Sequence, residues 1–300
     1  MTGCVRPACG ADCVDPPMSE VSTTRYLTRA VQLTVALTVG AVFIAVCSSV
    51  PGPGRAGRGS WAQHKASRWV LRAVGVRLSV HGAPRSGPSL VVGNHVSWLD
   101  ILALSASAPM RMVAKSEVAR WPLIGRSAAR TGTLFLERKR LRELPQAVAD
   151  MTAALRSGSR VQVFPEATTR CGGALDRFHR APFQAAINAG VVISPVTVQY
   201  LDGDDAGITS AAFVGDETLA SSVRRVLRTP RTTVQVHWLR PIPAIAGTGR
   251  DHVDRARVAA LAQNAVARNL GLPVRRPDGV AAVPTVGRVL GPDGVRALAG

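Results

Sequence analysis

The uncharged run from Ala30 to Val50 constrains the architecture of this chain more than any other feature. Its 21 residues, AVQLTVALTVGAVFIAVCSSV, contain no charged side chain. At a rise of about 1.5 Å per residue, a helix of this length just spans a hydrocarbon core of about 30 Å. We therefore expect residues 25–50 to form a membrane-anchoring helix that either spans the bilayer or inserts as an interfacial or re-entrant helix. A flexible segment, residues 1–24, and a Pro/Gly-rich linker, residues 51–59, are expected on either side.

Basic residues flank this run on both sides and are more numerous after it: Arg25 and Arg29 before, Arg55, Arg58, Lys65 and Arg68 after. Because positive charge is enriched on the cytoplasmic side of membrane helices, we expect the rest of the chain to face the cytoplasm.

Composition indicates a globular protein with anionic partners. The chain has 300 residues, of which 46% are hydrophobic, and its formal net charge is +18. Such a charge attracts polyanions, whether nucleic acid, an anionic membrane surface or phosphorylated ligands. The aromatic share of 4% is low for a protein that stacks bases, so we expect no nucleic acid partner.

The five cysteines do not form a recognisable framework. Cys4, Cys9 and Cys13 lie near the start, Cys47 lies in the apolar run and Cys171 lies far along the chain. Three cysteines with no nearby histidine are an incomplete zinc set, so the sequence predicts no metal site. Cytosolic thiols, rather than disulfides, fit this pattern.

Beyond the linker, short apolar runs alternate with helical patterns, which predicts an α/β fold with a mixed sheet covered by helices. The expected strands are Gly75–Val80, Leu90–Val92, Met110–Val113, Thr133–Leu136, Arg160–Phe164, Val191–Tyr200 and Thr232–Leu239. The expected helices are Leu99–Ser107, Leu141–Ser157, Pro182–Ala189 and Asp251–Leu270. This places the main domain at residues 60–272 and a loosely ordered tail at residues 273–300.

The stretch VVGNHVSWLDI, residues 91–101, carries the clearest chemical signal. His95 follows a predicted strand, and Asp100 comes five residues later as a helix begins. That spacing lets the carboxylate accept a hydrogen bond from one ring nitrogen and leaves the other to take a proton from a substrate hydroxyl. The spacing equally fits a helix-capping Asp100 and a His95 bonded to a backbone carbonyl.

NHVSWLD resembles the NHxxxxD signature of the glycerolipid acyltransferases, which include the 1-acylglycerol-3-phosphate acyltransferases. Three further blocks follow in the order of that family: KSEVARWPLIGRSAARTGTLFLER at 115–138, FPEATTR from 164, and VVISPVTVQY at 191–200. Four ordered blocks across residues 75–200 are far more specific than any single one.

The resemblance implies a membrane-associated enzyme that moves an acyl group from acyl-CoA or an acyl carrier protein to a lysophospholipid hydroxyl, most simply that of 1-acylglycerol-3-phosphate. It implies a catalytic pair, His95 and Asp100, and no cofactor or metal. It also implies a set of substrate-binding residues: Asn94, Lys115, Arg138, Glu166 and Thr168. Arg138 would hold the acceptor phosphate, Thr168 would contact it, and Glu166 would orient Arg138 or bond an acceptor hydroxyl.

The third block departs from the family pattern FPEGTRS. Ala167 stands where glycine is usual, so a positive φ there would be costly, and Thr169 stands where arginine is common. These changes bear on the acceptor head group. Another lysolipid, such as a lyso-ornithine lipid or a glycolipid, is therefore a rival acceptor, and a non-catalytic protein that binds membrane surfaces or nucleic acid is a rival of another class.

Overall fold

The structure, a computed structural model, describes residues 9–16, 19–50, 52, 54–137, 141–204, 206–244, 251–275 and 281–282. The expected N-terminal segment and tail therefore lie partly outside the described residues. Seven strands form one sheet in the order β1-β7-β6-β2-β5-β3-β4. Their bounds are β1 Val76–His81, β2 Ser89–Gly93, β3 Arg111–Lys115, β4 Leu134–Leu136, β5 Arg160–Val163, β6 Val192–Leu201 and β7 Thr232–Trp238. A two-stranded sheet pairs β8, Val274–Arg275, with β9, Ala281–Ala282.

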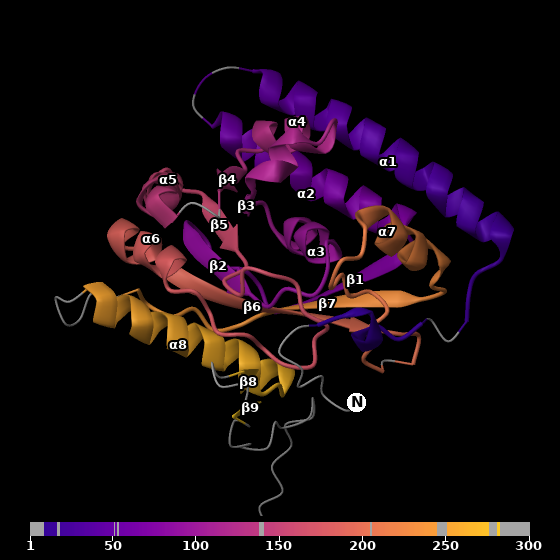
Figure 1. The fold of residues 1–300 in the computed structure, drawn as a ribbon. Helices are drawn as coiled ribbons and strands as arrows, with labels where there is room; N and C mark the ends of the chain where they lie inside the picture. The colour runs from indigo at the N-terminus through magenta and orange to yellow at the C-terminus, as the bar shows by residue number, and fades with distance from the viewer. Residues whose placement is uncertain are drawn as a thin grey trace, which may run out of the picture.

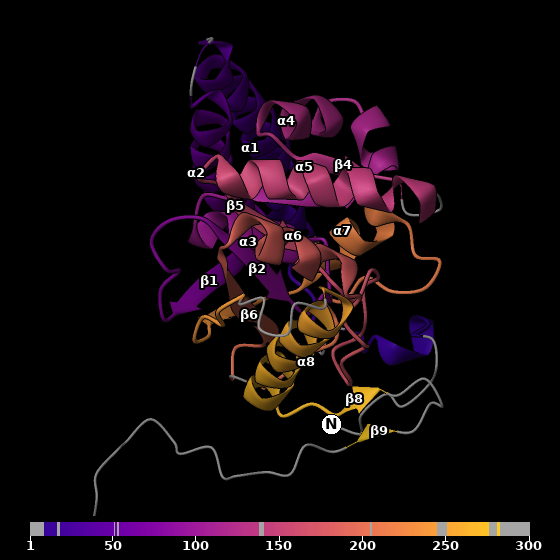
Figure 2. The same cartoon turned by 90° about the vertical axis from the view of Figure 1, so that its left-hand side faces the viewer.

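Helices cover both faces of the large sheet, as Figures 1 and 2 show. Their bounds are α1 Thr23–Ser49, α2 Arg55–Ala73, α3 Leu99–Ser107, α4 Ile124–Arg130, α5 Leu144–Arg156, α6 Ala181–Ala189, α7 Leu219–Arg228 and α8 Asp251–Leu270. Short 3-10 turns lie at η1 Ala11–Cys13, η2 Ser116–Arg120 and η3 Leu141–Glu143. The expected α/β class is confirmed, and each expected strand and helix is present within a few residues.

The sheet is parallel except where β6 meets β7 in antiparallel register, Val198 opposite Val236. β2 lies at the centre, parallel to β5 on one side and β6 on the other, and all five of its residues are buried. A strand covered on both faces needs apolar side chains on both. Val91 accordingly joins one core, while Leu90 and Val92 join the other.

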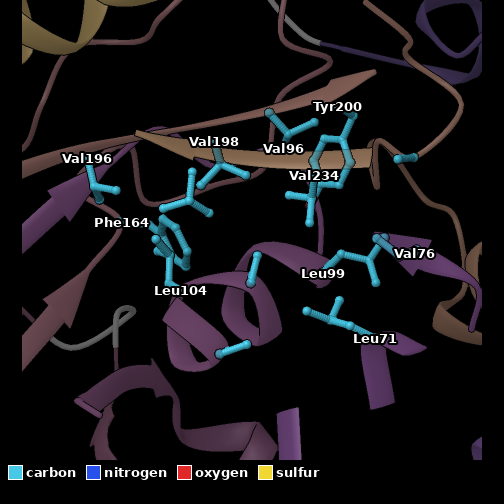
Figure 3. Packing of buried hydrophobic residues seen from close by; sticks show 14 of the residues in the cluster. Leu71, Val76, Val96, Leu99, Leu104, Phe164, Val196, Val198, Tyr200 and Val234 are labelled. Atoms are coloured by element: carbon cyan, nitrogen blue, oxygen red, sulfur yellow. The ribbon is translucent and has the colours of Figure 1, made fainter. Parts of the chain in front are cut away.

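The first core fills the space between the sheet and helices α2, α3 and α7. Figure 3 shows Leu99 and Leu104 of α3 beneath Val196 and Val198 of β6, with Leu71 and Val76 nearby. The second core packs α5, α6 and α8 against the opposite face, through residues such as Leu155, Phe183 and Val266. The result is a three-layer sandwich with helices on both sides of the sheet.

Helices α1 and α2 pack side by side along their length (Figure 1). Small residues permit this: a Cβ added at Gly40 of α1 would lie 3.1 Å from the Cβ of Ala66 in α2. The most apolar part of α1 has a mean hydropathy of 2.2, and only 11% of it is buried. α1 is therefore long and apolar enough to cross a membrane, and it keeps an exposed apolar stripe: Val31, Val35, Val39, Val42 and Val46.

The start of α2 differs from the sequence expectation. We expected a linker over residues 51–59, but the helix begins at Arg55 and includes Gly57 and Gly59. Glycine lowers helix propensity, which is why this segment reads as a linker. Gly59 is required by packing, because a Cβ there would lie 2.5 Å from the carbonyl oxygen of Arg130.

The two glycines provide a matched test of this packing. Gly59→Ala should destabilise the protein by about 1–3 kcal/mol, because the added methyl meets backbone that has no room to yield. Gly57→Ala is the control, since a Cβ there has no neighbour within 4 Å, and it should stabilise the exposed helix by about 0.5–1 kcal/mol. Thermal unfolding in detergent measures both. Equal shifts in unfolding temperature for the two variants would contradict the close contact between Gly59 and Arg130.

Candidate active site

The candidate site lies at the ends of two neighbouring strands, β2 and β5, after which the chain continues on opposite faces of the sheet. After β2 the chain enters α3 in the first core, whereas after β5 it runs to α6 in the second core. Such a switch point opens a crevice at the carboxyl ends of parallel strands, where ligands bind in open α/β sheets. His95 follows β2 by two residues and Glu166 follows β5 by three. The parallel register therefore brings the first and third motifs together.

His95 and Asp100 form the expected pair. The Nδ1 atom of His95 lies 2.8 Å from Oδ2 of Asp100. Asp100 is fully buried, whereas the His95 side chain retains 15% of its exposure. The pair leaves Nε2 as the ring nitrogen that can face a substrate. Such an imidazole is held in one orientation and can act as a general base.

Asp100 also organises the backbone of its own loop. Its Oδ2 accepts hydrogen bonds from the backbone N–H groups of Val96 at 2.6 Å and Ser97 at 2.8 Å. One carboxylate thus orients His95 and fixes the turn that leads into α3. The alternative reading is met only in part, because the His95 ring bonds Asp100 rather than a backbone carbonyl and the N-cap position of α3 is Trp98. A buried carboxylate needs this many donors to offset its lost hydration.

Tyr200, near the end of β6, supplies a further donor that sequence reasoning missed. Its hydroxyl lies 2.5 Å from Oδ1 of Asp100, the oxygen that His95 does not use. Burial, followed by the adjacent negative charge of Asp100, raises the pKa of Tyr200 well above its ordinary value. The phenol therefore stays protonated and donates. The only feature of the sequence that could have pointed to this contact is a single tyrosine near the end of a strand expected to be buried.

Two contacts fix the His95 ring and backbone from the β5 side. The ring of Phe164 stacks on the imidazole with centroids 3.7 Å apart and an interplanar angle of 3°. The backbone carbonyl of His95 accepts a hydrogen bond from the N–H of Arg170 at 2.7 Å. The loop after β5 thus covers one face of the imidazole and leaves its edge accessible.

Glu166 ties the same two loops together. Its Oε1 accepts the backbone N–H of His95 and its Oε2 accepts that of Asp176, both at 2.9 Å. Burial raises the pKa of Glu166 to about 8, although these two donors act in the opposite direction. We expected this residue to orient Arg138 or bond an acceptor hydroxyl. With both oxygens on backbone donors and 4% exposure, its observed role is to join the loops.

Asn94 likewise has a structural role where substrate binding was expected. Its side-chain amide donates to the carbonyl of Val198 at 2.8 Å and accepts from the Val198 N–H at 2.9 Å. Both polar ends of this buried side chain are therefore used to fasten the His95 loop to β6. The motif needs asparagine here because only a side-chain amide both donates and accepts in this way.

The other expected substrate residues are more scattered. Thr168 is exposed in the loop after Glu166, and Lys115 is exposed at the carboxyl end of β3, on the same edge of the sheet as His95. Arg138 lies outside the described residues. Ala167, in the position where glycine is usual, adopts φ +60°, so the loop takes the positive φ at some cost in strain.

Known proteins with this pattern are acyltransferases. The family model described as Acyltransferase matches residues 77–199. The chain is 37% identical over 210 residues to the lyso-ornithine lipid O-acyltransferase of Pseudomonas aeruginosa, covering 68% of this chain and 78% of that protein. It is 34% identical over 174 residues to the 1-acyl-sn-glycerol-3-phosphate acyltransferase of Neisseria meningitidis, covering 57% of this chain and 68% of the relative.

A solved structure supports the same fold. The crystal structure of the 1-acyl-sn-glycerophosphate acyltransferase from Thermotoga maritima superposes with a TM-score of 0.58. It covers 81% of this chain and 96% of its own, at 16% sequence identity. The α/β fold, a sheet flanked by helices, is therefore shared.

The raised pKa of Glu166 predicts a pH-dependent stability. Between about pH 5 and 8 the folded protein keeps this proton and the unfolded chain has lost it. As the pH rises through this range, the free energy of unfolding of the wild type should fall by about 1.4 kcal/mol per pH unit relative to that of Glu166→Gln, whose amide cannot titrate. The free energy of unfolding of both proteins is measured in detergent from pH 5 to 9 and plotted against pH. The difference between the two slopes is the test, because any destabilisation by the substitution itself is the same at every pH and does not change the slope. Parallel curves would show that Glu166 is ionised throughout.

Proposed function

Since the chain belongs to the glycerolipid acyltransferase family, we propose that it transfers a fatty acyl group from an acyl thioester to the free hydroxyl of a lysophospholipid. The observation that carries this proposal is the His95–Asp100 pair, with Nδ1 bonded to a buried carboxylate and the ring edge accessible. Among the described residues, Ser97, which lies between His95 and Asp100 in the chain, is fully buried and offers no exposed hydroxyl as a nucleophile. The substrate hydroxyl therefore serves as the nucleophile.

The proposed reaction is a direct transfer. Nε2 of His95 removes the hydroxyl proton as the oxygen attacks the thioester carbonyl, which becomes a tetrahedral oxyanion. Collapse of this intermediate breaks the carbon–sulfur bond and expels the thiolate. The proton passes from His95 to the thiolate or to solvent, which restores the neutral imidazole. No acyl-enzyme, metal or cofactor takes part in these steps.

The proposed acceptor is 1-acylglycerol-3-phosphate. The relative from Neisseria meningitidis carries that substrate in its name. Arg138 would bind the phosphate through its forked, permanently charged guanidinium. Lys115, at the same edge of the sheet as His95, would add a second positive charge.

A lyso-ornithine lipid is the second candidate acceptor. The relative from Pseudomonas aeruginosa bears that name and is 37% identical. The third block of this chain also lacks one expected arginine, at Thr169. A weaker cation set suits a head group that carries a carboxylate and an amine better than it suits a phosphate dianion.

The acyl donor and the membrane surface fit the charge and shape of the protein. With a net charge of +18, the protein would attract CoA phosphates, acidic carrier proteins and anionic lipids. The exposed valine stripe of α1 would enter the bilayer. This anchor would hold the catalytic domain on the cytoplasmic side, where acyl-CoA and carrier proteins are made.

Acyl transfer is tested with membranes containing the protein and with acyl-CoA or acyl carrier protein as donor. Thiol release should require lysophosphatidate or lyso-ornithine lipid, and mass spectrometry of the diacyl product identifies which. His95→Ala should lower kcat by at least about 10²-fold, as expected for loss of a general base. Arg138→Ala should chiefly raise the KM for lysophosphatidate. Absence of acceptor-dependent release with every donor and acceptor would reject the proposed function.

Tyr200→Phe tests the support of the catalytic pair. Removing the hydroxyl leaves Oδ1 of Asp100 without this donor, so kcat should fall about tenfold, or about 1.4 kcal/mol, with little change in KM. The matched control is Tyr26→Phe, because Tyr26 is the other tyrosine of the chain and lies in α1 against Arg228. Steady-state kinetics compare the two variants. An unchanged kcat in Tyr200→Phe would show that Asp100 does not need this donor for catalysis.

A further inference from the structure

Three cysteines from distant parts of the chain meet beside the loop that follows β5. Cys9 and Cys13 belong to the N-terminal segment, and Cys171 comes directly after Arg170. Their Sγ atoms all lie within 4.8 Å of one another, and those of Cys9 and Cys171 are 3.5 Å apart. From the sequence alone, only Cys9 and Cys13 could be expected to lie close together, because Cys171 comes 158 positions after Cys13.

A tight turn brings the first two thiols together. The 3-10 turn η1 is closed by hydrogen bonds from the N–H of Cys13 to the Gly10 carbonyl at 3.0 Å and from the N–H of Val14 to the Ala11 carbonyl at 3.1 Å. The segment is then fastened to the domain, where Asp15 exchanges hydrogen bonds of 2.8 and 2.9 Å with Thr209. The protein's own contacts thus position this segment against Cys171.

The cluster is sheltered and lies next to a positive charge. Cys9 and Cys171 are 8% and 4% exposed and belong to the core between the sheet and α3. The N–H of Cys171 points to the Cys9 sulfur at 3.5 Å, and the Arg170 guanidinium also interacts with Cys9. Donors and a cation around a sulfur atom favour the thiolate, which is the form that binds metal.

The sulfur geometry matches a tetrahedral zinc site better than a disulfide. Two thiolates on one tetrahedral zinc are about 3.8 Å apart, given zinc–sulfur bonds of about 2.3 Å. A disulfide joins two sulfurs at about 2.0 Å and leaves a third without a role. Zn²⁺ is also the common partner of clustered cysteines in reducing compartments.

We propose that Cys9, Cys13 and Cys171 bind a structural zinc ion, which fastens the N-terminal segment to the loop between β5 and α6. The fourth coordination position would be taken by water. This inference does not depend on which lipid the enzyme acylates. It differs from the sequence expectation of no metal site, in which Cys171 stood apart from the N-terminal cysteines.

The zinc ion would act on the active site through short backbone connections. Arg170, which precedes Cys171, donates its N–H to the His95 carbonyl at 2.7 Å. Further along the same loop, the backbone N–H of Asp176 donates a hydrogen bond to the Glu166 carboxylate. The Asp176 carboxylate accepts a hydrogen bond from Nε of Arg170 at 2.5 Å. Fixing Cys171 would therefore stabilise the loop that covers His95. The ion would not contact substrate, so its role is positioning.

Metal content is the direct test. The full-length protein is purified in detergent from cells grown with added zinc, and bound metals are measured by inductively coupled plasma mass spectrometry. We expect about one zinc ion per chain in the wild type and in Cys47→Ser, whose cysteine lies in α1 outside the cluster. Cys9→Ser and Cys171→Ser should each lose most of this zinc, because a structural site needs its full set of thiolates.

A second measurement keeps the test independent of variant folding. Treating the wild-type protein with a mercurial reagent should release zinc to a colorimetric dye as its thiols react. Cobalt substitution should produce thiolate-to-cobalt charge-transfer absorption. A wild type without zinc and with all thiols open to alkylation would overturn the proposal. So would a Cys9–Cys171 disulfide found by peptide mass spectrometry, or iron with acid-labile sulfide.

Discussion

The buried carboxylate of Asp100 is the group on which the geometry of the candidate active site depends. It is fully buried and accepts hydrogen bonds from the His95 ring, two backbone N–H groups and the hydroxyl of Tyr200. These donors come from two elements whose positions the carboxylate then helps to determine: the loop between β2 and α3, and β6. Burying such a charge is unfavourable unless it is fully hydrogen-bonded. The same bonds that offset this cost orient the imidazole.

A second set of bonds joins the two sides of the switch point. Glu166 links the His95 loop to Asp176, and Arg170 links the loop after β5 to the His95 carbonyl. The β2 and β5 loops leave the sheet toward opposite faces, so without these bonds they would be free to separate. The positive φ of Ala167 is tolerated because the contacts around it over-determine the loop conformation. The proposed zinc site would extend this network to the N-terminal segment.

Much of the fold could be predicted because its signals are local. The buried strand at Leu90–Val92 and the helix Asp251–Leu270 follow from apolar patterning alone, and their ends agree with β2 and α8. The start of α2 could not be predicted, since Gly57 and Gly59 resemble a linker until the close approach of Arg130 is seen. The functions of Asn94 and Glu166 were expected to involve substrate. Their partners, Val198 and Asp176, are backbone groups that no sequence pattern marks.

The sequence by itself determined the apolar helix and the α/β class, because each depends on residues near one another in the chain. It indicated the His95–Asp100 pair through the order of the family's motifs, since the spacing alone also fitted a structural role. Only the tertiary structure decided what supports that pair. Tyr200 lies 100 residues from Asp100 and Cys171 lies 162 residues from Cys9. Tyr200 meets Asp100 because the order and register of the strands place the carboxyl ends of β2, β5 and β6 at one edge of the sheet. Cys9 meets Cys171 because Asp15 fastens the N-terminal segment to Thr209. Strand order is the outcome of global packing, and local residue patterns carry little information about it.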